Sequence, residues 1–227
     1  MTHGQRGARV GDVDVRVDVP LYTLTEVAEF VEVPKSTLRY WVTNKQLVRA
    51  LPRDRRGDAY LPFMAVAEAE FIHNMRRSGL RLAAVEEGVT ALRKHLGPGW
   101  LQRDRLAHDG VDILRNLADQ GDPEWTRARD AQAGIPGYID IGLEHIEFDT
   151  DGIPGRVRLA KYAGAEVIID PRFGFGQPIL DEQGVRVQDV AELFLAGDSI
   201  AVVSEEFGVA KPVVESIVRS YARRRAA

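Results

Sequence analysis

The stretch TLTEVAEFVEVPKSTLRYWV, residues 23–42, decides the fold of the N-terminal part of this chain. Thr23 and Glu26 have the spacing of a capping box, in which each side chain accepts a hydrogen bond from the other residue's backbone N–H. An apolar helical face follows and stops at Pro34, which has no N–H to donate. A second short helix is predicted over 35–42, and its inner face is formed by Leu38, Trp41 and Val42. Two short helices joined by a tight turn predict a helix-turn-helix, whose second helix enters the DNA major groove.

The outer face of the second helix carries side chains of the kinds that contact phosphates and base edges. These are Lys35, Ser36, Thr37, Arg39 and Tyr40. Residues 47–51 and 59–61 flank a turn-forming segment, and they predict the two strands of a hairpin, or wing. We expect this wing and its approach to hold the DNA backbone or the minor groove. The residues concerned are Arg53, Arg55 and Arg56, and Lys45 between the helix and the wing is a further predicted DNA contact.

The charge of the chain is segregated. Residues 34–58 contain seven cations and two carboxylates, a local charge of +5, whereas the whole chain carries −4. A local basic patch can neutralise phosphates and release their counterions. The charge pattern therefore favours DNA as a partner, with binding confined to this segment.

Composition excludes several classes of protein. The 227 residues include no cysteine, so disulfides, thiolate catalysis and cysteine-bound metals are excluded. No run of 18 apolar residues predicts a membrane span, and the first twenty residues lack the apolar stretch of a secretory signal, which favours the cytoplasm. Neither a glycine-rich phosphate loop nor a Ser-His-Asp set is apparent, so we expect no enzyme, no cofactor and no metal. The alternation from His145 to Asp151 is better explained by the polar face of a strand than by a metal cluster.

Residues 21–96 resemble the winged-helix DNA-binding domain of the MerR family. The segments that carry the resemblance are 22–24, the helix 36–41 and the turn 75–82. MerR regulators dimerise through a long helix after this domain. Here Gly97-Pro98-Gly99 ends the corresponding helix, so the chain departs from the family at that point.

The rest of the chain predicts a mainly α protein with a smaller β part. Residues 1–20 form an N-terminal arm with an alternating strand pattern over 10–19, 21–97 the winged-helix domain, and 98–134 a helical linker. From 135 to 227 we expect a β segment followed by a trihelical domain. Its predicted strands are 138–143, 146–148, 156–159 and 166–169. Asp198 or Ser199 is expected to cap a helix that ends at Phe207, with Gly208 in the turn before a last helix.

A second resemblance covers about 55 residues of the C-terminal third. Asp170-Pro171, Gly176-Gln177-Pro178, Gly184-Val185-Arg186 and the segment 196–199 are similar to a small domain found in bacterial antitoxins. Val185 replaces the threonine that is usual in that domain. The helix pair at its end also has helix-turn-helix geometry, but its cations are few, so contact with a protein or dimerisation is an alternative to DNA binding.

Together, the two resemblances imply a DNA-binding antitoxin of the VapB type. Such a protein neutralises a cognate PIN-type ribonuclease, represses the shared operon by binding double-stranded operator DNA, and is expected to be a homodimer. An inhibitor of an acidic nuclease site needs a basic element or one that plugs the site. The candidates for toxin binding are Arg156, Arg158, Lys161, Arg172, Arg223, Arg224 and Arg225. The alternative is a stand-alone MerR-like transcriptional regulator whose C-terminal domain responds to a small molecule.

Overall fold

The computed structural model describes residues 9–10, 13–53, 55, 57–162 and 164–226, without the side chains of residues 9, 10 and 223–226. The chain divides into two compact units, residues 1–155 and 156–227. Helices make up most of the described residues and the strands are short, which confirms the mainly α prediction with a smaller β part. No helix of the described part is long and apolar enough to cross a membrane.

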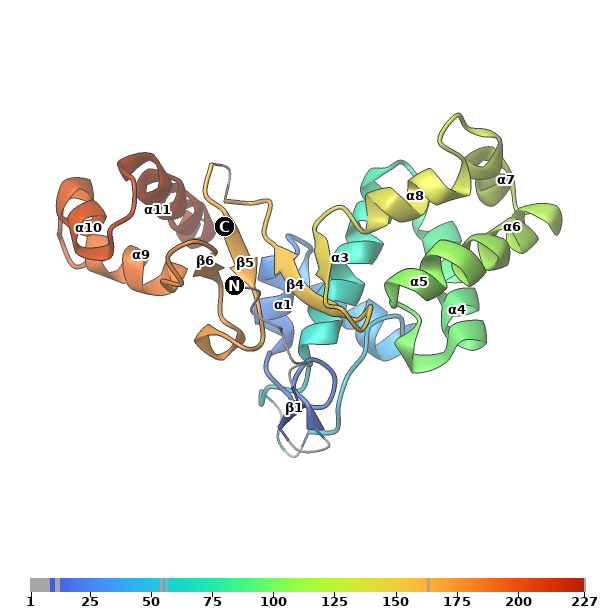
Figure 1. Ribbon diagram of the computed structural model, residues 1–227, viewed down its shortest axis with the longest axis horizontal. Helices are drawn as coiled ribbons and strands as arrows, with labels where there is room; N and C mark the ends of the chain where they lie inside the picture. Colours follow the sequence, from blue (N-terminus) through green and yellow to red (C-terminus); the bar gives the residue numbers. More distant parts are fainter. Residues whose placement is uncertain (1–8, 11–12, 54, 56, 163, 227) are drawn as a thin grey trace. The chain divides into compact units, whose positions relative to one another are not determined.

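In the first unit, the predicted helix-turn-helix follows the N-terminal arm, and its first helix is α1 (Figure 1). Helix α1 spans Leu24–Phe30, α2 spans Lys35–Arg39, and the chain continues in a π-helical turn, η1, over Tyr40–Asn44. The capping box is confirmed, because Thr23 Oγ1 accepts the Glu26 N–H at 3.3 Å and Glu26 Oε2 accepts the Thr23 N–H at 2.8 Å. The three residues predicted for the inner face of the second helix are buried.

Helix α3 (Phe63–Arg77) forms the centre of the first unit and packs against α1, α4 (Leu82–Leu96) and α8 (Gly134–Gly142). Its residues are buried on nearly every side, apart from the last turn. The predicted stop after α4 is confirmed, since Gly97 takes a left-handed φ of 74° and the short turn η2 (Gly97–Gly99) follows. The segment expected to be a linker folds into α5 (Arg103–Arg105), η3 (Leu106–Gly110), α6 (Val111–Asp119) and α7 (Pro123–Asp130).

The prediction of a strand over 138–143 is wrong, because these residues belong to helix α8. Ile135, Ile139 and Gly142 are its buried residues, at the spacing of one helical face. A Cβ at Gly142 would lie 2.5 Å from the ring of Phe71 on α3, so the glycine permits this close packing. Tertiary contact with α3 therefore overrides the β propensity of the isoleucines and tyrosine.

The prediction of regular wing strands over 47–51 and 59–61 is also wrong for the described residues. One backbone hydrogen bond joins the two sides, from Leu51 N–H to Tyr60 O at 2.8 Å, and Leu61 forms a bridge with Tyr22 instead. The Arg49 N–H donates to the carboxylate of Glu68 on α3, and Pro52 has no N–H to offer. The wing is therefore a loop fixed at its base by α3.

The N-terminal arm differs from the alternating strand expected over 10–19. Two-residue strands β1 (Arg9–Val10) and β2 (Val13–Asp14) pair in a short hairpin, and a turn follows. Val13 is 47% exposed, whereas Arg16 is fully buried. Its guanidinium binds the carboxylates of Asp14 at 2.8 Å, Asp149 at 2.9 Å and Asp151 at 2.6 Å.

In the first unit, β3 (Ile146–Phe148) confirms the strand predicted over 146–148, and β4 (Pro154–Arg158) runs across the boundary between the units. In the second unit, β4, β5 (Val167–Ile169) and β6 (Ile179–Leu180) form antiparallel neighbours, with Val157 opposite Ile169 and Ile168 opposite Ile179.

Helices α9 (Val187–Leu195), α10 (Ile200–Phe207) and α11 (Lys211–Ala226) complete the second unit as the predicted trihelical domain. Ser199 caps α10 by accepting the Val202 N–H at 3.3 Å, and Gly208 ends it in a left-handed conformation. Both features agree with the sequence prediction.

Candidate nucleic-acid interface

A hollow of about 510 Å³ lies between the start of α1, the α2–η1 segment and the wing loop. It brings together three of the predicted DNA contacts, Lys35, Arg39 and Arg53, although Arg53 is fourteen residues beyond Arg39 in sequence. Lys35 and Arg39 are exposed, and neither forms an ion pair among the described residues. Three cations around one hollow give a surface that can hold phosphates.

The other predicted contacts take several positions. Ser36 and Tyr40 are exposed and Thr37 is half-buried, all on α2 or at the start of η1. The Arg55 side chain is exposed, and its backbone N–H donates to Asp58 at 3.1 Å, which shapes the turn of the wing. Arg56 lies outside the described residues.

Lys45 is held away from the hollow by its own contacts. Its ammonium lies 2.9 Å from the carboxylate of Glu86 on α4 and 5.6 Å from the centroid of the Tyr40 ring. The hydrogen bond with Glu86 raises the pKa of Lys45. Lys45 therefore contributes charge to this face while it is anchored to α4.

Arg53 is positioned by an aromatic ring. Its guanidinium carbon lies 4.5 Å from the centroid of the Tyr60 ring, within the range of a cation–π contact. Such stacking restricts a flexible side chain before any ligand arrives, and it leaves the N–H groups of the guanidinium available to phosphate oxygens. The sequence prediction included Arg53 but gave no sign of Tyr60 as its support.

Hydroxyl groups add to the lining of the hollow, and the sequence prediction missed them. Thr23 and Thr25 lie at the start of α1, and Thr43 lies in η1. Hydroxyls are common phosphate donors. However, Thr23 already bonds to Glu26, and the Thr43 hydroxyl donates to the Arg39 carbonyl at 2.8 Å. Thr25 is the remaining candidate. Its position at the N-terminus of α1 is the one signal in the sequence that indicates a phosphate contact.

A buried carboxylate holds the base of the wing. Glu68 of α3 accepts hydrogen bonds from the Arg49 backbone N–H, from Arg93 at 3.1 Å and from the indole N–H of Trp100 at 3.0 Å. Burial raises the pKa of Glu68, and the nearby Arg93 opposes this shift. Because one side chain fixes the wing, α4 and the segment after it, the position of Arg53 depends on the core of the unit.

Four of the cations predicted to bind a toxin have partners within the second unit. Arg156 pairs with Asp170 at 3.1 Å and with Asp181 at 3.3 Å, while Arg172 pairs with Asp170 at 2.7 Å. Arg158 pairs with Glu166, and the ammonium of Lys161 lies 5.2 Å from the centroid of the Tyr162 ring. Arg223, Arg224 and Arg225 are in α11, but their side chains lie outside the described residues.

The residues considered as a metal cluster have other partners. His145 Nδ1 lies 2.7 Å from the Glu70 carboxylate, and Asp149 and Asp151 bind Arg16. Among the described residues, no group of three or more His, Asp or Glu side chains could hold a metal ion.

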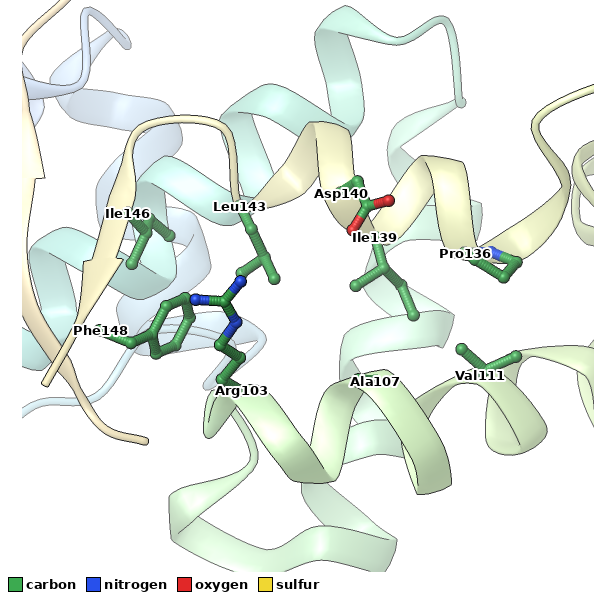
Figure 2. Close-up of a pocket in the computed structure, with 9 residues that line it drawn as sticks. All are labelled: Arg103, Ala107, Val111, Pro136, Ile139, Asp140, Leu143, Ile146 and Phe148. Atoms are coloured by element: carbon green, nitrogen blue, oxygen red, sulfur yellow. The ribbon is translucent and has the colours of Figure 1, made fainter. Parts of the chain in front are cut away.

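A second hollow, of about 390 Å³, lies in the helical part of the first unit (Figure 2). Seven of its nine lining residues are apolar, and the other two are the charged residues Arg103 on α5 and Asp140 on α8. The guanidinium carbon of Arg103 lies 5.9 Å from the centroid of the Phe148 ring, at one end of the hollow. The apolar lining is formed by Ala107, Val111, Pro136, Ile139, Leu143, Ile146 and Phe148.

Comparisons with known proteins agree with both parts of the sequence prediction. Residues 22–91 match the MerR HTH family regulatory protein family. The Mycobacterium tuberculosis protein named "Putative antitoxin VapB45" is 32% identical over 220 residues, a match that spans 87% of this chain and 92% of that protein. The X-ray crystal structure of Rv2018 from Mycobacterium tuberculosis is similar with a TM-score of 0.78 at 32% identity, and it covers 89% of this chain and 99% of that chain.

Proposed function

This chain belongs to the family of the protein named "Putative antitoxin VapB45" and carries a MerR-type helix-turn-helix domain, and we propose that it is a DNA-binding antitoxin. It neutralises a PIN-type ribonuclease encoded with it and represses their operon from the cytoplasm. The observation that carries the DNA-binding part is the convergence of Lys35, Arg39 and Arg53 around one hollow of the MerR-type domain.

The DNA-binding proposal assigns the contacts as follows. The exposed face of α2 enters the major groove, and Arg53 and Arg55 of the wing hold the backbone or the minor groove. The three cations of the hollow make phosphate contacts that are independent of sequence. Base readout falls to the polar side chains of α2, because that helix is the element that can reach base edges.

Salt-dependent binding to operator DNA tests these contacts. The double variant Arg39→Ala/Arg53→Ala removes two phosphate contacts and should lower the slope of log K against log salt by about 1.8. A matched control, Lys94→Ala/Arg115→Ala, removes the same charge from exposed positions that do not line the hollow, on α4 and α6. We expect the control to leave the slope almost unchanged. Equal slopes for the two variants would contradict the assignment.

The toxin partner is tested by co-expression with the neighbouring nuclease gene of the same operon. We expect a stable complex and loss of RNA cleavage when this chain is added in equal amount. Arg156, Arg158, Lys161, Arg172 and the arginines 223–225 remain the proposed cationic contacts. Alanine at these positions should weaken inhibition if they reach the acidic site. A nuclease that stays active and separate from the intact chain would refute the antitoxin function.

The proposed assembly is a homodimer. A DNA-binding dimer places two recognition helices about one turn of DNA apart. Helix α4 ends at Leu96 and so is too short for the long dimer helix of MerR regulators. The contact must then come from elsewhere in the chain. Sedimentation at several concentrations, with and without operator DNA, would show whether the dimer exists.

A second candidate function is favoured by the hollow of Figure 2. Its size and apolar lining suit a small ligand, and Arg103 could bind an anionic group. The chain would then be a regulator that responds to an organic acid. A thermal shift with a panel of apolar carboxylates, compared between the wild type and Arg103→Met, tests this function. A ligand that stabilises both proteins equally would count against the site.

A further inference from the structure

The turn Phe173–Gly176, which connects β5 to β6 in the second unit, exposes two aromatic rings. Phe173 is 54% exposed and Phe175 is 89% exposed. Most large apolar side chains of a folded protein lie in its core, and an aromatic ring that is almost wholly in water is an informative exception. We call residues 173–176 the Phe175 turn.

The backbone of the Phe175 turn is left-handed over three consecutive residues. Gly174, Phe175 and Gly176 have φ angles of 56°, 55° and 75°. This conformation suits glycine, but it is unfavourable for a residue with a Cβ and most unusual for a bulky one. Glycine therefore occupies the first and third positions for a clear reason. At the middle position, a phenylalanine stands where the backbone favours glycine.

The Phe175 turn is held in place by hydrogen bonds and by packing against β6. Asp170, fully buried at the end of β5, accepts hydrogen bonds from the Arg172 backbone N–H at 2.9 Å and from both guanidinium groups of Arg156 and Arg172. Backbone N–H groups of Phe173, Gly176 and Gln177 close successive turns at 3.1, 2.9 and 3.0 Å. A Cβ at Gly174 would lie 2.8 Å from Ile179 of β6, so the turn is pressed against the sheet. These contacts fix the backbone of the turn and leave the ring of Phe175 exposed to solvent.

An unfavourable backbone and an exposed ring at the same residue indicate that Phe175 serves a purpose other than folding. Strained positions of this kind occur at binding sites, where the surrounding structure enforces them. Aromatic side chains are frequent anchors of protein interfaces, because they bury a large area at a small cost in conformational entropy.

We propose that the Phe175 turn is the anchor by which this chain holds its nuclease partner, which offers an apolar socket for the Phe175 ring. This inference rests on the proposed antitoxin function. Within that function, the Phe175 turn contributes more to nuclease binding than Arg156, Arg158 and Arg172, because these arginines already have carboxylate partners in the second unit. To bind an acidic nuclease site, each guanidinium would have to exchange its carboxylate partner in this chain for one in the nuclease, and this exchange would contribute little binding free energy.

A second copy of the chain fits this surface less well than a different protein. A two-fold dimer contact must be self-complementary, so the same patch has to supply both the projecting ring and its socket. Neither of the two hollows described above lies in the second unit. Two exposed rings also bury at most about 500 Å², less than the roughly 800 Å² per partner of a stable interface. The partner must therefore provide a concave surface and further contacts of its own.

The variant Phe175→Gly separates binding from folding. Relief of the left-handed strain should raise the melting temperature by about 2–4 °C. Loss of the anchor should weaken binding of the nuclease encoded in the same operon by about 30-fold or more in calorimetry, and RNA cleavage should resume accordingly. Leu195→Ala on α9 is the matched control, since Leu195 is 51% exposed and apolar in the same unit. It should bind like the wild type. Phe175→Asn, which also tolerates the left-handed region, should reproduce the loss of binding.

Each other outcome overturns the proposal. Wild-type affinity for Phe175→Gly would refute the anchor and leave the antitoxin function standing, whereas failure of the intact chain to bind the nuclease would refute both. A lower melting temperature would show that the ring packs within the chain. Loss of self-association with retained nuclease binding would assign the turn to a dimer, and equal weakening by Leu195→Ala would show an unspecific apolar effect.

Discussion

Replacement of Arg16 by methionine should destabilise the first unit. The guanidinium is fully buried and contacts three carboxylates, of which those of Asp14 and Asp149 are 13% and 12% exposed and that of Asp151 is 38% exposed. The Arg16 carbonyl accepts the Met64 N–H at 2.8 Å at the start of α3. The side chain of Arg16 thus joins the N-terminal arm to the turn after β3, while the backbone of the same residue is bound to the central helix.

The size of the effect follows from these contacts. Methionine keeps much of the volume but leaves three carboxylates close together without a cation. Loss of one partner from a buried ion pair costs about 3–5 kcal/mol. Because Asp151 is partly solvated, we expect the lower end of this range, about 3 kcal/mol. In a protein of this length, that loss lowers the melting temperature by roughly 6–12 °C.

The pH dependence gives a second and sharper test. In the wild type, burial opposes ionisation of Asp14, but the side-chain and backbone hydrogen bonds from Arg16 and its charge together outweigh burial and lower the pKa. A separate hydrogen bond from the Arg16 guanidinium lowers the pKa of Asp151. A lowered pKa stabilises the fold above the ordinary value near 3.8, and the stabilisation is lost as the pH falls below it. In Arg16→Met, mutual repulsion raises the carboxylate pKa values, so stability is regained as the pH falls from 7 toward 4.

Thermal unfolding by circular dichroism between pH 7 and pH 4 measures this difference. The gap in melting temperature between the wild type and Arg16→Met should be largest at pH 7 and should narrow toward pH 4. Arg115→Met, which removes an arginine paired with exposed Asp112 on α6, is the control and should change little. A gap that is small, or that does not depend on pH, would refute the carboxylate cluster as the cause.

Three further predictions concern the packing around α3. Gly142→Ala places a Cβ 2.5 Å from the ring of Phe71 and should cost about 1–3 kcal/mol, measured by urea unfolding, with an unchanged midpoint as the contrary result. The hydrogen bond with Glu70 raises the pKa of His145. The stabilisation from this pair should therefore be complete below pH 6.5 and should be lost as the pH rises above 6.5. Proton NMR titration of His145 should show the raised pKa in the wild type, and Glu70→Gln should abolish the increase. Glu68→Gln leaves at least one buried donor unpaired and should cost about 2–3 kcal/mol, whereas a neutral effect on urea unfolding would count against the hydrogen-bond network.

The helix-turn-helix was predictable because its signals are local. The capping box of Thr23 and Glu26, the stop at Pro34 and the apolar spacing each depend on residues within one or two helical turns. The structure confirms all three. The trihelical domain was predictable for the same reason, since Ser199 and Gly208 mark helix ends by their own chemistry.

The errors arose where distant residues decide the local structure. Arg16 is buried because Asp149 and Asp151 lie beside it, about 135 residues later in the chain, and the alternation of valines gave no sign of them. The segment 138–143 has strand-forming residues, but Phe71 of α3 accepts Gly142 and its helix instead. In both cases a long-range contact outweighs a short-range preference.

The sequence predicted which residues form the candidate site, but not which of them contact other residues of the chain. Sequence reasoning placed Lys45 beside Arg39 as equal contacts, yet Lys45 pairs with Glu86 on α4. The support of Arg53 by Tyr60 likewise depends on the fold of the wing loop. Charge patterns therefore indicate where cations gather, whereas the structure shows which of them already have partners.

The two proposed partners of the chain, DNA and a nuclease, differ in whether the cations expected to bind them are already paired. Lys35 and Arg39 have no ion pair among the described residues, so binding to phosphate replaces only water and counterions, and the released counterions favour association. Arg156 and Arg172 share the fully buried Asp170, and their removal to a nuclease would leave that carboxylate buried without a counter-charge. The first unit can therefore bind a polyanion at little structural cost, whereas the second unit must bind its partner mainly through surface that its ion pairs do not use. The exposed rings of Phe173 and Phe175 are such a surface, which is why a mutation of an aromatic residue should impair nuclease inhibition more than a mutation of a paired arginine.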